Sequence, residues 1–143
     1  MPYHYREDLA TADVAFEAWG ATVEEMFTAA AHATMNVMVR ELSTIAPRAR
    51  KSLRVEEEAL DLLLFQLLQE LIFYKDAERL LLLVESVRIQ KSGERYDLVA
   101  EAAGEELNAE RHELIVDVKA VTLHRFKVEQ GPRGWEALVI LDI

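Results

Sequence analysis

The sequence of 143 residues predicts a single α+β domain in which two helices pack on a largely antiparallel β-sheet and the chain ends in a β-hairpin. Three observations predict this fold. Residues 117–129 alternate between two side-chain classes for longer than any other segment, as a strand does. Segments that begin at Thr22 and Leu60 carry apolar residues at helical spacing, and turn signals separate further β-rich segments. Strand, helix, strand, helix and then hairpins is an order typical of α+β domains.

The long strand at residues 117–129 would have one buried face and one partly wet face. Every second side chain falls on the presumed inner face, namely Val116, Val118, Ala120, Thr122, His124, Phe126 and Val128. The sequence Gly131-Pro132-Arg133-Gly134 predicts a turn, and residues 135–143 are β-rich again. We therefore expect a hairpin that places Asp142 and the carboxylate of Ile143 at a strand end.

The N-terminal half is expected to contain two strands and a helix. Residues 3–5 fit a short edge strand, and residues 14–20 fit a strand that ends at a glycine turn. Thr22 and Glu25 have the spacing of a capping box, so the first helix should begin at Thr22. This helix should end before Ala46-Pro47, because proline cannot continue a helix.

The middle of the chain is expected to add three strands and the core helix. Residues 48–56 fit an edge strand, and residues 60–74 have leucines on most sides, which predicts a helix buried across the sheet. Residues 80–90 and 94–102 fit two strands, and residues 91–93 fit the hairpin turn between them. No repeat or second domain is indicated.

Composition excludes several classes of protein. The chain has no cysteine, which rules out a disulfide framework and a thiolate zinc site and suits the cytoplasm. Its most apolar run, residues 60–74, contains charged and amide residues and is too short to span a bilayer. With 16 basic and 26 acidic residues, the net charge of −10 repels a phosphate backbone. We expect a soluble protein without membrane contact and without tight, direct binding to nucleic acid.

Two aspartates at opposite ends of the chain form the first candidate site. Asp13 opens a strand and Asp142 closes the last one, so antiparallel pairing of these strands would bring both carboxylates to one edge beside that of Ile143. Oxygen ligands alone favour calcium, magnesium or manganese over zinc. Lys119 could reach the same edge. The alternative is that Asp13 caps a turn while Asp142 and Lys119 are simply solvated.

Other catalytic constellations are not supported. The four histidines lack metal-ligand spacing, and His112-Glu113 has no second histidine where a zinc protease helix would need it. The five glycines do not form a phosphate-binding loop, and no serine has the context of a nucleophile elbow. His124, on the presumed inner strand face, is expected to be a half-buried structural histidine. The sequence thus argues against a self-sufficient enzyme.

The chain resembles the archease family along nearly its whole length. The segments that carry the resemblance, in order, are Thr11-Ala12-Asp13-Val14 with Ala18 and Gly20, Leu68-Gln69-Glu70-Leu71-Ile72 with Asp76-Ala77-Glu78, Arg111-His112-Glu113, Val118-Lys119-Ala120-Val121-Thr122-Leu123-His124, and Val139-Ile140-Leu141-Asp142-Ile143. The combination of the lysine-alanine-valine-threonine strand with the leucine-aspartate-isoleucine ending is specific.

The resemblance implies a function in tRNA splicing. Archeases are small α+β proteins that support the RNA-splicing ligase, which seals ends bearing a 2′,3′-cyclic phosphate or a 3′-phosphate. By resemblance, this chain would speed the guanylylation of that ligase with GTP and would not itself join RNA. The family's divalent-metal site, with calcium as the first expectation, would fall on Asp13, Asp142 and the Ile143 carboxylate, with Lys119 as a neighbour needed for activity.

One departure and two alternatives accompany this expectation. The family usually has an acidic residue and a histidine where this chain has Leu9-Ala10, so any contribution of that histidine is absent. A general chaperone or modulator of RNA-processing proteins, acting through an apolar groove without a metal, is the main alternative. A hydrolase that uses two carboxylates is the other.

Overall fold

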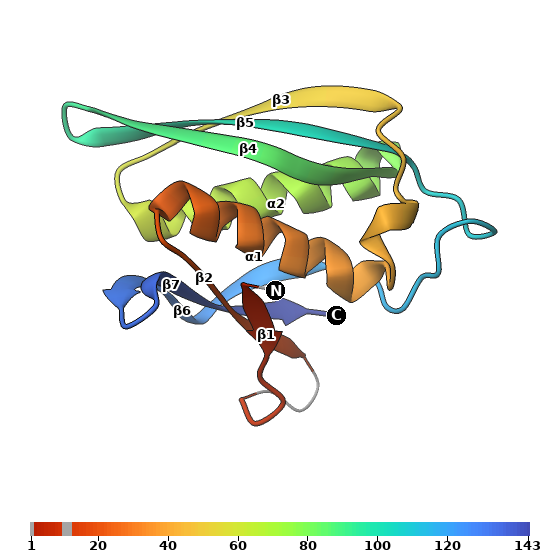
Figure 1. The fold of residues 1–143 in the computed structure, drawn as a ribbon, viewed down its shortest axis with the longest axis horizontal. Helices are drawn as coiled ribbons and strands as arrows, with labels where there is room; N and C mark the ends of the chain where they lie inside the picture. The colour runs from red at the N-terminus through yellow and green to blue at the C-terminus, as the bar shows by residue number, and fades with distance from the viewer. Residues whose placement is uncertain (1, 10–12) are drawn as a thin grey trace.

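The structure, a computed structural model, describes residues 2–9 and 13–143 and contains two antiparallel sheets (Figure 1). The four-stranded sheet has the order β1-β2-β7-β6, with bounds Tyr3–Tyr5, Val14–Gly20, Gly134–Asp142 and Ala120–Gly131. The three-stranded sheet has the order β3-β5-β4, with bounds Ala49–Glu57, Arg95–Glu106 and Leu80–Ser92.

Two helices lie between the sheets and form the centre of the core. These are α1 (Val23–Met38) and α2 (Leu60–Glu78), and each contacts strands of both sheets (Figure 1). A short 3₁₀ helix, η1 (Leu42–Thr44), leads from α1 towards β3. Because both sheets cover the same helices, apolar side chains from every layer join in one buried cluster.

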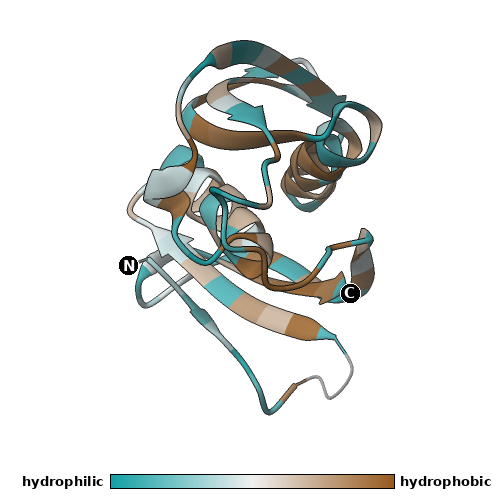
Figure 2. Ribbon diagram, turned by 90° about the vertical axis from the view of Figure 1, so that its right-hand side faces the viewer, coloured by the Kyte–Doolittle hydropathy of each residue, from teal (hydrophilic) through white to brown (hydrophobic). Residues whose placement is uncertain are grey.

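The α+β class, the two helices and the C-terminal hairpin are confirmed, and the strands divide between two sheets. Bands of brown and teal alternate along several strands in Figure 2, as expected where one face is buried and one is wet. The first sheet pairs the N-terminal strands with the C-terminal hairpin, while the second collects the three strands of the middle of the chain. The helices therefore have a sheet on either side instead of a single covered face.

The first helix begins where its capping box predicts. Thr22 is the N-cap, and its side chain accepts a hydrogen bond of 3.1 Å from the backbone N–H of Glu25. The carboxylate of Glu25 accepts a hydrogen bond of 3.0 Å from the N–H of Ala21, one residue before the usual partner. Two otherwise unpaired backbone groups at this helix end are thus satisfied.

The second helix is longer and less completely buried than its leucines suggest. It runs to Glu78 and ends at Arg79, which adopts the left-handed conformation with φ 52°. The buried face includes Leu64, Leu68 and Leu71, but Phe73 is 56% exposed. The expectation of burial on most sides is therefore wrong for the outer face of this helix.

The long strand is interrupted by a bulge, which changes the face assigned to several residues. Its pairing with β7 shifts between Thr122 and Lys127, and Arg125 there has a positive φ of 56°. Val121 is consequently buried although alternation placed it on the wet face, and His124 is exposed although alternation placed it inside. A bulge inserts unpaired residues and so reverses the alternation on either side of it.

Within the described ranges, neither helix combines the length and the hydropathy required to cross a bilayer.

Candidate cation site at one end of the four-stranded sheet

The pairing register brings the two predicted aspartates to the same end of the four-stranded sheet. Strand β2 pairs with β7 antiparallel, and the pair nearest that end is Val14 with Leu141. Asp13 directly precedes Val14, and Asp142 directly follows Leu141, so the two aspartates lie at neighbouring strand ends. Both are half-buried, as is Ile143, whose side chain packs against the core.

Lys119 lies at the same end of the sheet, because it directly precedes strand β6, which pairs with β7. Ala120 is the register partner of Asp142, and the backbone N–H of Lys119 donates a 2.8 Å hydrogen bond to the carbonyl of Asp142. Lys119 itself is exposed. The backbone around Asp142 is therefore held from one side by β2 and from the other by the start of β6.

Two side chains of α2 fix the segment that leads into β6. Gln69 accepts a 3.0 Å hydrogen bond from the N–H of Val121 through its Oε1. Lys75, 6% exposed, donates to the carboxylates of Asp76 and Asp117 and, at 2.9 Å, to the carbonyl of Val118. Periodicity indicates α2 only as a core helix and does not distinguish these two polar residues from others on it, although Gln69 lies in a segment that carries the family resemblance.

The pKa of Lys75 is raised above its ordinary value. Burial acts in the opposite direction, but the hydrogen bonds that Lys75 donates to Asp117 and Asp76 outweigh it. All three ammonium hydrogens have acceptors, so Lys75 is a charged anchor for the segment before β6.

The donor chemistry of this sheet end suits a hard cation. The carboxylates of Asp13 and Asp142 are oxygen donors, which calcium, magnesium and manganese prefer. No group of three His, Asp or Glu side chains suited to a metal occurs in the part of the chain that the structure describes. Asp13 and Asp142 are two such side chains, and the expected Ile143 carboxylate would add a third oxygen donor from the main chain. Leu9-Ala10 stands where the family usually has an acidic residue and a histidine, and Ala10 lies outside the described residues.

A second polar cluster, not predicted as such, lies under the loop that follows β5. Glu105 is 3% exposed and accepts hydrogen bonds from the N–H of Ala46 at 2.7 Å, from Arg48 Nε at 3.1 Å and from Arg111. His112, 1% exposed, meets the same carboxylate through Nε2 at 2.9 Å. The Arg111-His112 pair stood out in the sequence, but nothing there indicated its acidic partner.

The histidine tautomer in this cluster follows from its two partners. The N–H of Asn108 donates to His112 Nδ1 at 2.9 Å, so Nδ1 is unprotonated and Nε2 carries the hydrogen that Glu105 accepts. The hydrogen bond from the Ala46 N–H, supported by those from His112 and by the charge of Arg111, lowers the pKa of Glu105 to about 2 against the effect of burial. This geometry fixes a loop and includes no nucleophile.

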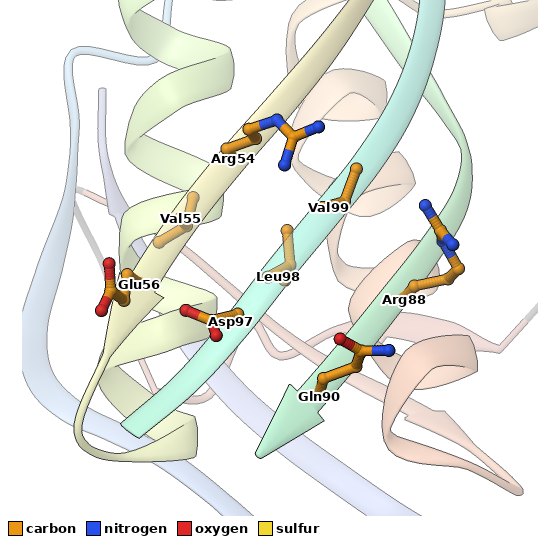
Figure 3. Close-up of a pocket in the computed structure, with 8 residues that line it drawn as sticks. All are labelled: Arg54, Val55, Glu56, Arg88, Gln90, Asp97, Leu98 and Val99. Atoms are coloured by element: carbon orange, nitrogen blue, oxygen red, sulfur yellow. The ribbon is translucent and has the colours of Figure 1, made fainter. Parts of the chain in front are cut away.

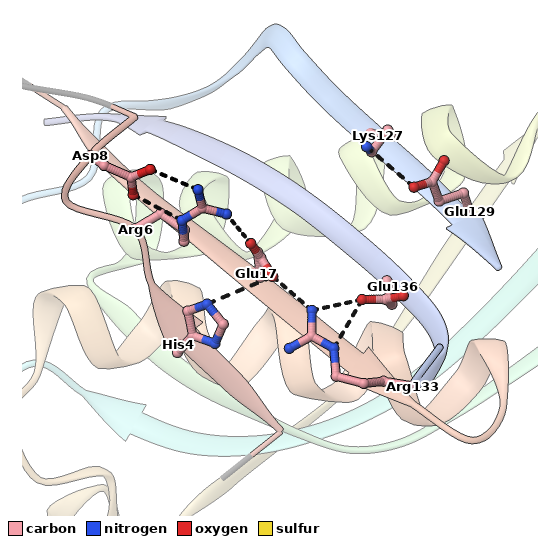
Figure 4. Close-up of polar contacts among 8 residues, drawn as sticks. All are labelled: His4, Arg6, Asp8, Glu17, Lys127, Glu129, Arg133 and Glu136. Carbon is pink, nitrogen blue, oxygen red and sulfur yellow. Dashed lines mark hydrogen bonds and ion pairs between the residues drawn. The ribbon is translucent and has the colours of Figure 1, made fainter. Parts of the chain in front are cut away.

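The outer face of the four-stranded sheet carries a network of ion pairs (Figure 4). Glu17 accepts from Arg133 at 2.7 Å and also from Arg6, and Arg133 donates in addition to Glu136. The hydrogen bond from Arg133 is the main cause of a lowered pKa at Glu17. The network ties β1, β2 and the hairpin turn before β7 together, and its members satisfy one another.

A shallow hollow of about 490 Å³ lies on the outer face of the three-stranded sheet (Figure 3). Arg54 and Arg88 are both register partners of Val99, and their side chains flank it. Glu56 and Asp97 lie in the adjoining row, so two cations and two anions line neighbouring rows of the hollow. Such a balance does not select a ligand of either sign.

Comparisons with known proteins agree on one family. The model of the archease protein family matches residues 3–143. The archease of Thermococcus gammatolerans is 39% identical over 141 residues, which cover 98% of this chain and 96% of that protein. The archease of Thermococcus kodakarensis is 40% identical over the same length and the same shares.

Two solved structures share the fold. Protein 1598 of Methanobacterium thermoautotrophicum, solved in solution, has a TM-score of 0.86 and 31% identity, with 99% of each chain covered. A Thermotoga maritima crystal structure, described as an archease and possible chaperone, has a TM-score of 0.59 and 20% identity, with 98% of each chain covered. The second likeness concerns the fold alone.

Proposed function

The chain belongs to the archease family, and from that premise we propose that it is an accessory protein that activates the RNA-splicing ligase and is not itself an enzyme. In this proposal it acts in tRNA splicing, in the cytoplasm, on the ligase that joins ends bearing a 2′,3′-cyclic phosphate or a 3′-phosphate. It speeds the GTP-dependent guanylylation of that ligase.

The observation that carries the proposal is the register that sets Asp13 and Asp142 at neighbouring strand ends. In this role the two carboxylates hold a divalent cation, calcium first and magnesium or manganese otherwise, together with the carboxylate of Ile143. A bound cation supplies positive charge that attracts phosphate oxygens. The Lys119 N–H, bonded to the Asp142 carbonyl, keeps the strand end in place. In this proposal the exposed side chain of Lys119 supplies a second positive charge at this sheet end.

Charge also suits a protein partner of this kind. The net charge of −10 disfavours direct contact with an RNA backbone but favours approach to a ligase that binds RNA and is therefore basic near its substrate. The acidic sheet end would then approach the nucleotide cleft of the ligase.

The test is guanylylation of the purified ligase with GTP and manganese, with and without the accessory protein. Asp13→Asn and Asp142→Asn remove one charge each while keeping side-chain shape, and we expect each to lower the stimulated rate by at least about tenfold. Glu129→Gln, which removes an exposed charge elsewhere on the same sheet, is the matched control and should stimulate normally. Circular dichroism checks that each variant is folded. Full stimulation by both aspartate variants would remove the proposed site.

The role of Ile143 has a separate test. Residues appended after Ile143 move the terminal carboxylate away from the strand end, whereas the same residues appended before Met1 do not. We expect the C-terminal extension alone to abolish the heat of calcium or manganese binding in a calorimetric titration. Equal heats from both extended proteins would exclude the Ile143 carboxylate as a ligand.

A second candidate function is a chaperone or modulator of RNA-processing proteins that works without a metal. A set of exposed apolar residues favours it, and the Thermotoga maritima relative is described as a possible chaperone. The calorimetric titration separates the two functions, because a chaperone of this kind gives no heat that depends on Asp13.

A further inference from the structure

Three consecutive apolar residues are exposed just before the acidic sheet end. Leu114, Ile115 and Val116, here called the edge strip, have exposures of 42%, 44% and 39%. An alternating strand would hide every second one of them, and a run of three exposed apolar residues is costly unless it has a use. The strip lies in the loop that runs from β5 to β6 past the end of α1 (Figure 1).

Backbone hydrogen bonds on one side hold the edge strip against the end of α1. The N–H of Ile115 donates to the carbonyl of Met38 at 2.9 Å, and the N–H of Arg40 donates to the carbonyl of Glu113 at 2.9 Å. These bonds form an isolated antiparallel bridge between Val39 and Leu114. Lys75 holds the following residues through Asp117 and Val118. The strip is therefore preorganised and does not have to be ordered on binding.

The other side of the edge strip has unpaired backbone groups. Successive residues of an extended chain direct their backbone groups to opposite sides, and Glu113 and Ile115 use the side of α1. The N–H and C=O groups of Leu114 and Val116 therefore face away from α1. Across the described ranges, no backbone or side-chain hydrogen bond reaches these four groups. Unpaired edges of this kind accept an added strand.

A small apolar pocket adjoins the strip. Its volume is about 180 Å³, and its apolar lining comes from Met38, Leu81, Leu107 and the strip itself. Lys75 also lines it, but its ammonium hydrogens are all taken. The volume lies below the ~300–1,000 Å³ of small-molecule sites, so the pocket suits one apolar side chain of a bound segment. In strand addition, main-chain bonds give affinity and such pockets give specificity.

Charge identifies the kind of segment that would bind. Residues 105–117 contain five acidic side chains and one basic one, and the exposed Glu113 and Asp117 flank the strip. Arg40 pairs with Glu113, but Lys75 is shared between Asp117 and Asp76, and within the described ranges the exposed Glu106 and Glu110 have no ion pair. The surface beside the strip therefore stays net acidic. A second copy of this chain would bring the same acidic segment against itself, which is repulsive. An apolar extended segment with lysine or arginine beside it is attracted.

We propose that the edge strip docks the partner ligase by adding a strand to an extended, apolar segment of the ligase that has basic neighbours. This inference rests on the proposed function and names its contact surface. Only Asp117 and Val118 separate the strip from Lys119, whose N–H bonds Asp142. A segment bound at the strip would consequently direct the ligase to the acidic sheet end.

Two strip variants test this proposal with the full chain and the purified ligase. Leu114→Ser with Val116→Ser removes apolar contact, and Val116→Pro removes one outward N–H without removing any hydrogen bond within the described chain. Leu123→Ser is the control, since Leu123 is 60% exposed on the edge strand β6 and outside the strip. We expect both strip variants to raise the Kd for the ligase at least about tenfold in calorimetric titration, and the control to leave it unchanged.

Stimulation separates docking from activation. At saturating concentration the strip variants should restore the full guanylylation rate, whereas Asp142→Asn should not at any concentration. An unchanged Kd for strip variants while the wild-type chain stimulates would overturn the docking surface and leave the proposed function in place. Absence of both binding and stimulation by the wild-type chain would overturn both. Loss of a homodimer in sedimentation, with ligase affinity unchanged, would assign the strip to a second copy and overturn the proposal.

Discussion

Glu105 illustrates how much of the structure depends on single polar residues inside it. Its carboxylate joins the residues before β3, at Ala46 and Arg48, to the loop after β5, at Arg111 and His112. Removing it would leave several donors without their acceptor, which costs more than one hydrogen bond contributes. The same loop carries the edge strip, so the position of the strip depends on this carboxylate.

The lowered pKa of Glu105, about 2, predicts a pH dependence of stability. An unfolded glutamate titrates near pH 4.3, so the native contribution is complete above that pH and is lost as pH falls towards 2. Glu105→Gln should lower the melting temperature at neutral pH, and its melting temperature should fall less than that of the wild type between about pH 5 and 2.5. Thermal melts by circular dichroism measure both. Glu106→Gln, an exposed neighbour on β5, is the control, and an acid slope shared by all three proteins would contradict the assignment.

The predicted site residues show what spacing in a sequence can and cannot indicate. Asp13 and Asp142 were found because each adjoins a clear strand, and antiparallel pairing then makes them neighbours. The contacts of Glu105 and Gln69 were not predicted, although Gln69 lies in a segment that carries the resemblance, because a polar residue on a strand or helix gives no sign of whether it meets a partner far away in sequence. Only the tertiary arrangement makes one a buried acceptor and the other an anchor of β6.

At the level of elements, strands and helices followed from periodicity, whereas their grouping did not. Every expected strand exists, but hairpins in one sheet or in two have the same local pattern, so the division into two sheets was not visible. The bulge in β6 was missed for a related reason. Arg125 in the left-handed region has no sequence signal such as glycine or asparagine, and alternation was therefore extended through it.

Two glycines with positive φ, Gly93 and Gly134, lie at the turns of two hairpins. Gly134 has φ 98°, and a Cβ there would lie 2.5 Å from the carbonyl oxygen of Gly20. Gly93 has φ 64° with open space around it. Gly93→Ala should cost about 1 kcal/mol from conformation alone, and Gly134→Ala on the order of 3 kcal/mol or more because a backbone clash is added. Urea unfolding measures both, and equal losses would contradict the close approach of this turn to β2.

At the scale of the molecule, the helices connect the two sheets. Both α1 and α2 contact strands of each sheet, and one apolar cluster includes residues of all three layers. The N- and C-terminal strands complete the four-stranded sheet together, so neither end of the chain can detach without exposing the helices. Asp13 and Asp142 are neighbours only when both of these strands are in place, so the proposed cation site depends on both.

This arrangement predicts that the molecule unfolds in one step. Both tryptophans, Trp19 on β2 and Trp135 on β7, report on the four-stranded sheet, whereas far-ultraviolet circular dichroism is dominated by α1 and α2. Because the helices cannot keep their buried face without both sheets, the fluorescence and dichroism transitions in urea should have the same midpoint and slope.

Calcium at 100 times its Kd should move both transitions together, stabilising the protein by about 2.7 kcal/mol. Asp142→Asn should abolish that shift while keeping the two transitions coincident. A tryptophan transition that precedes the helical one would mean that the four-stranded sheet, and the aspartate pair with it, opens independently of the core.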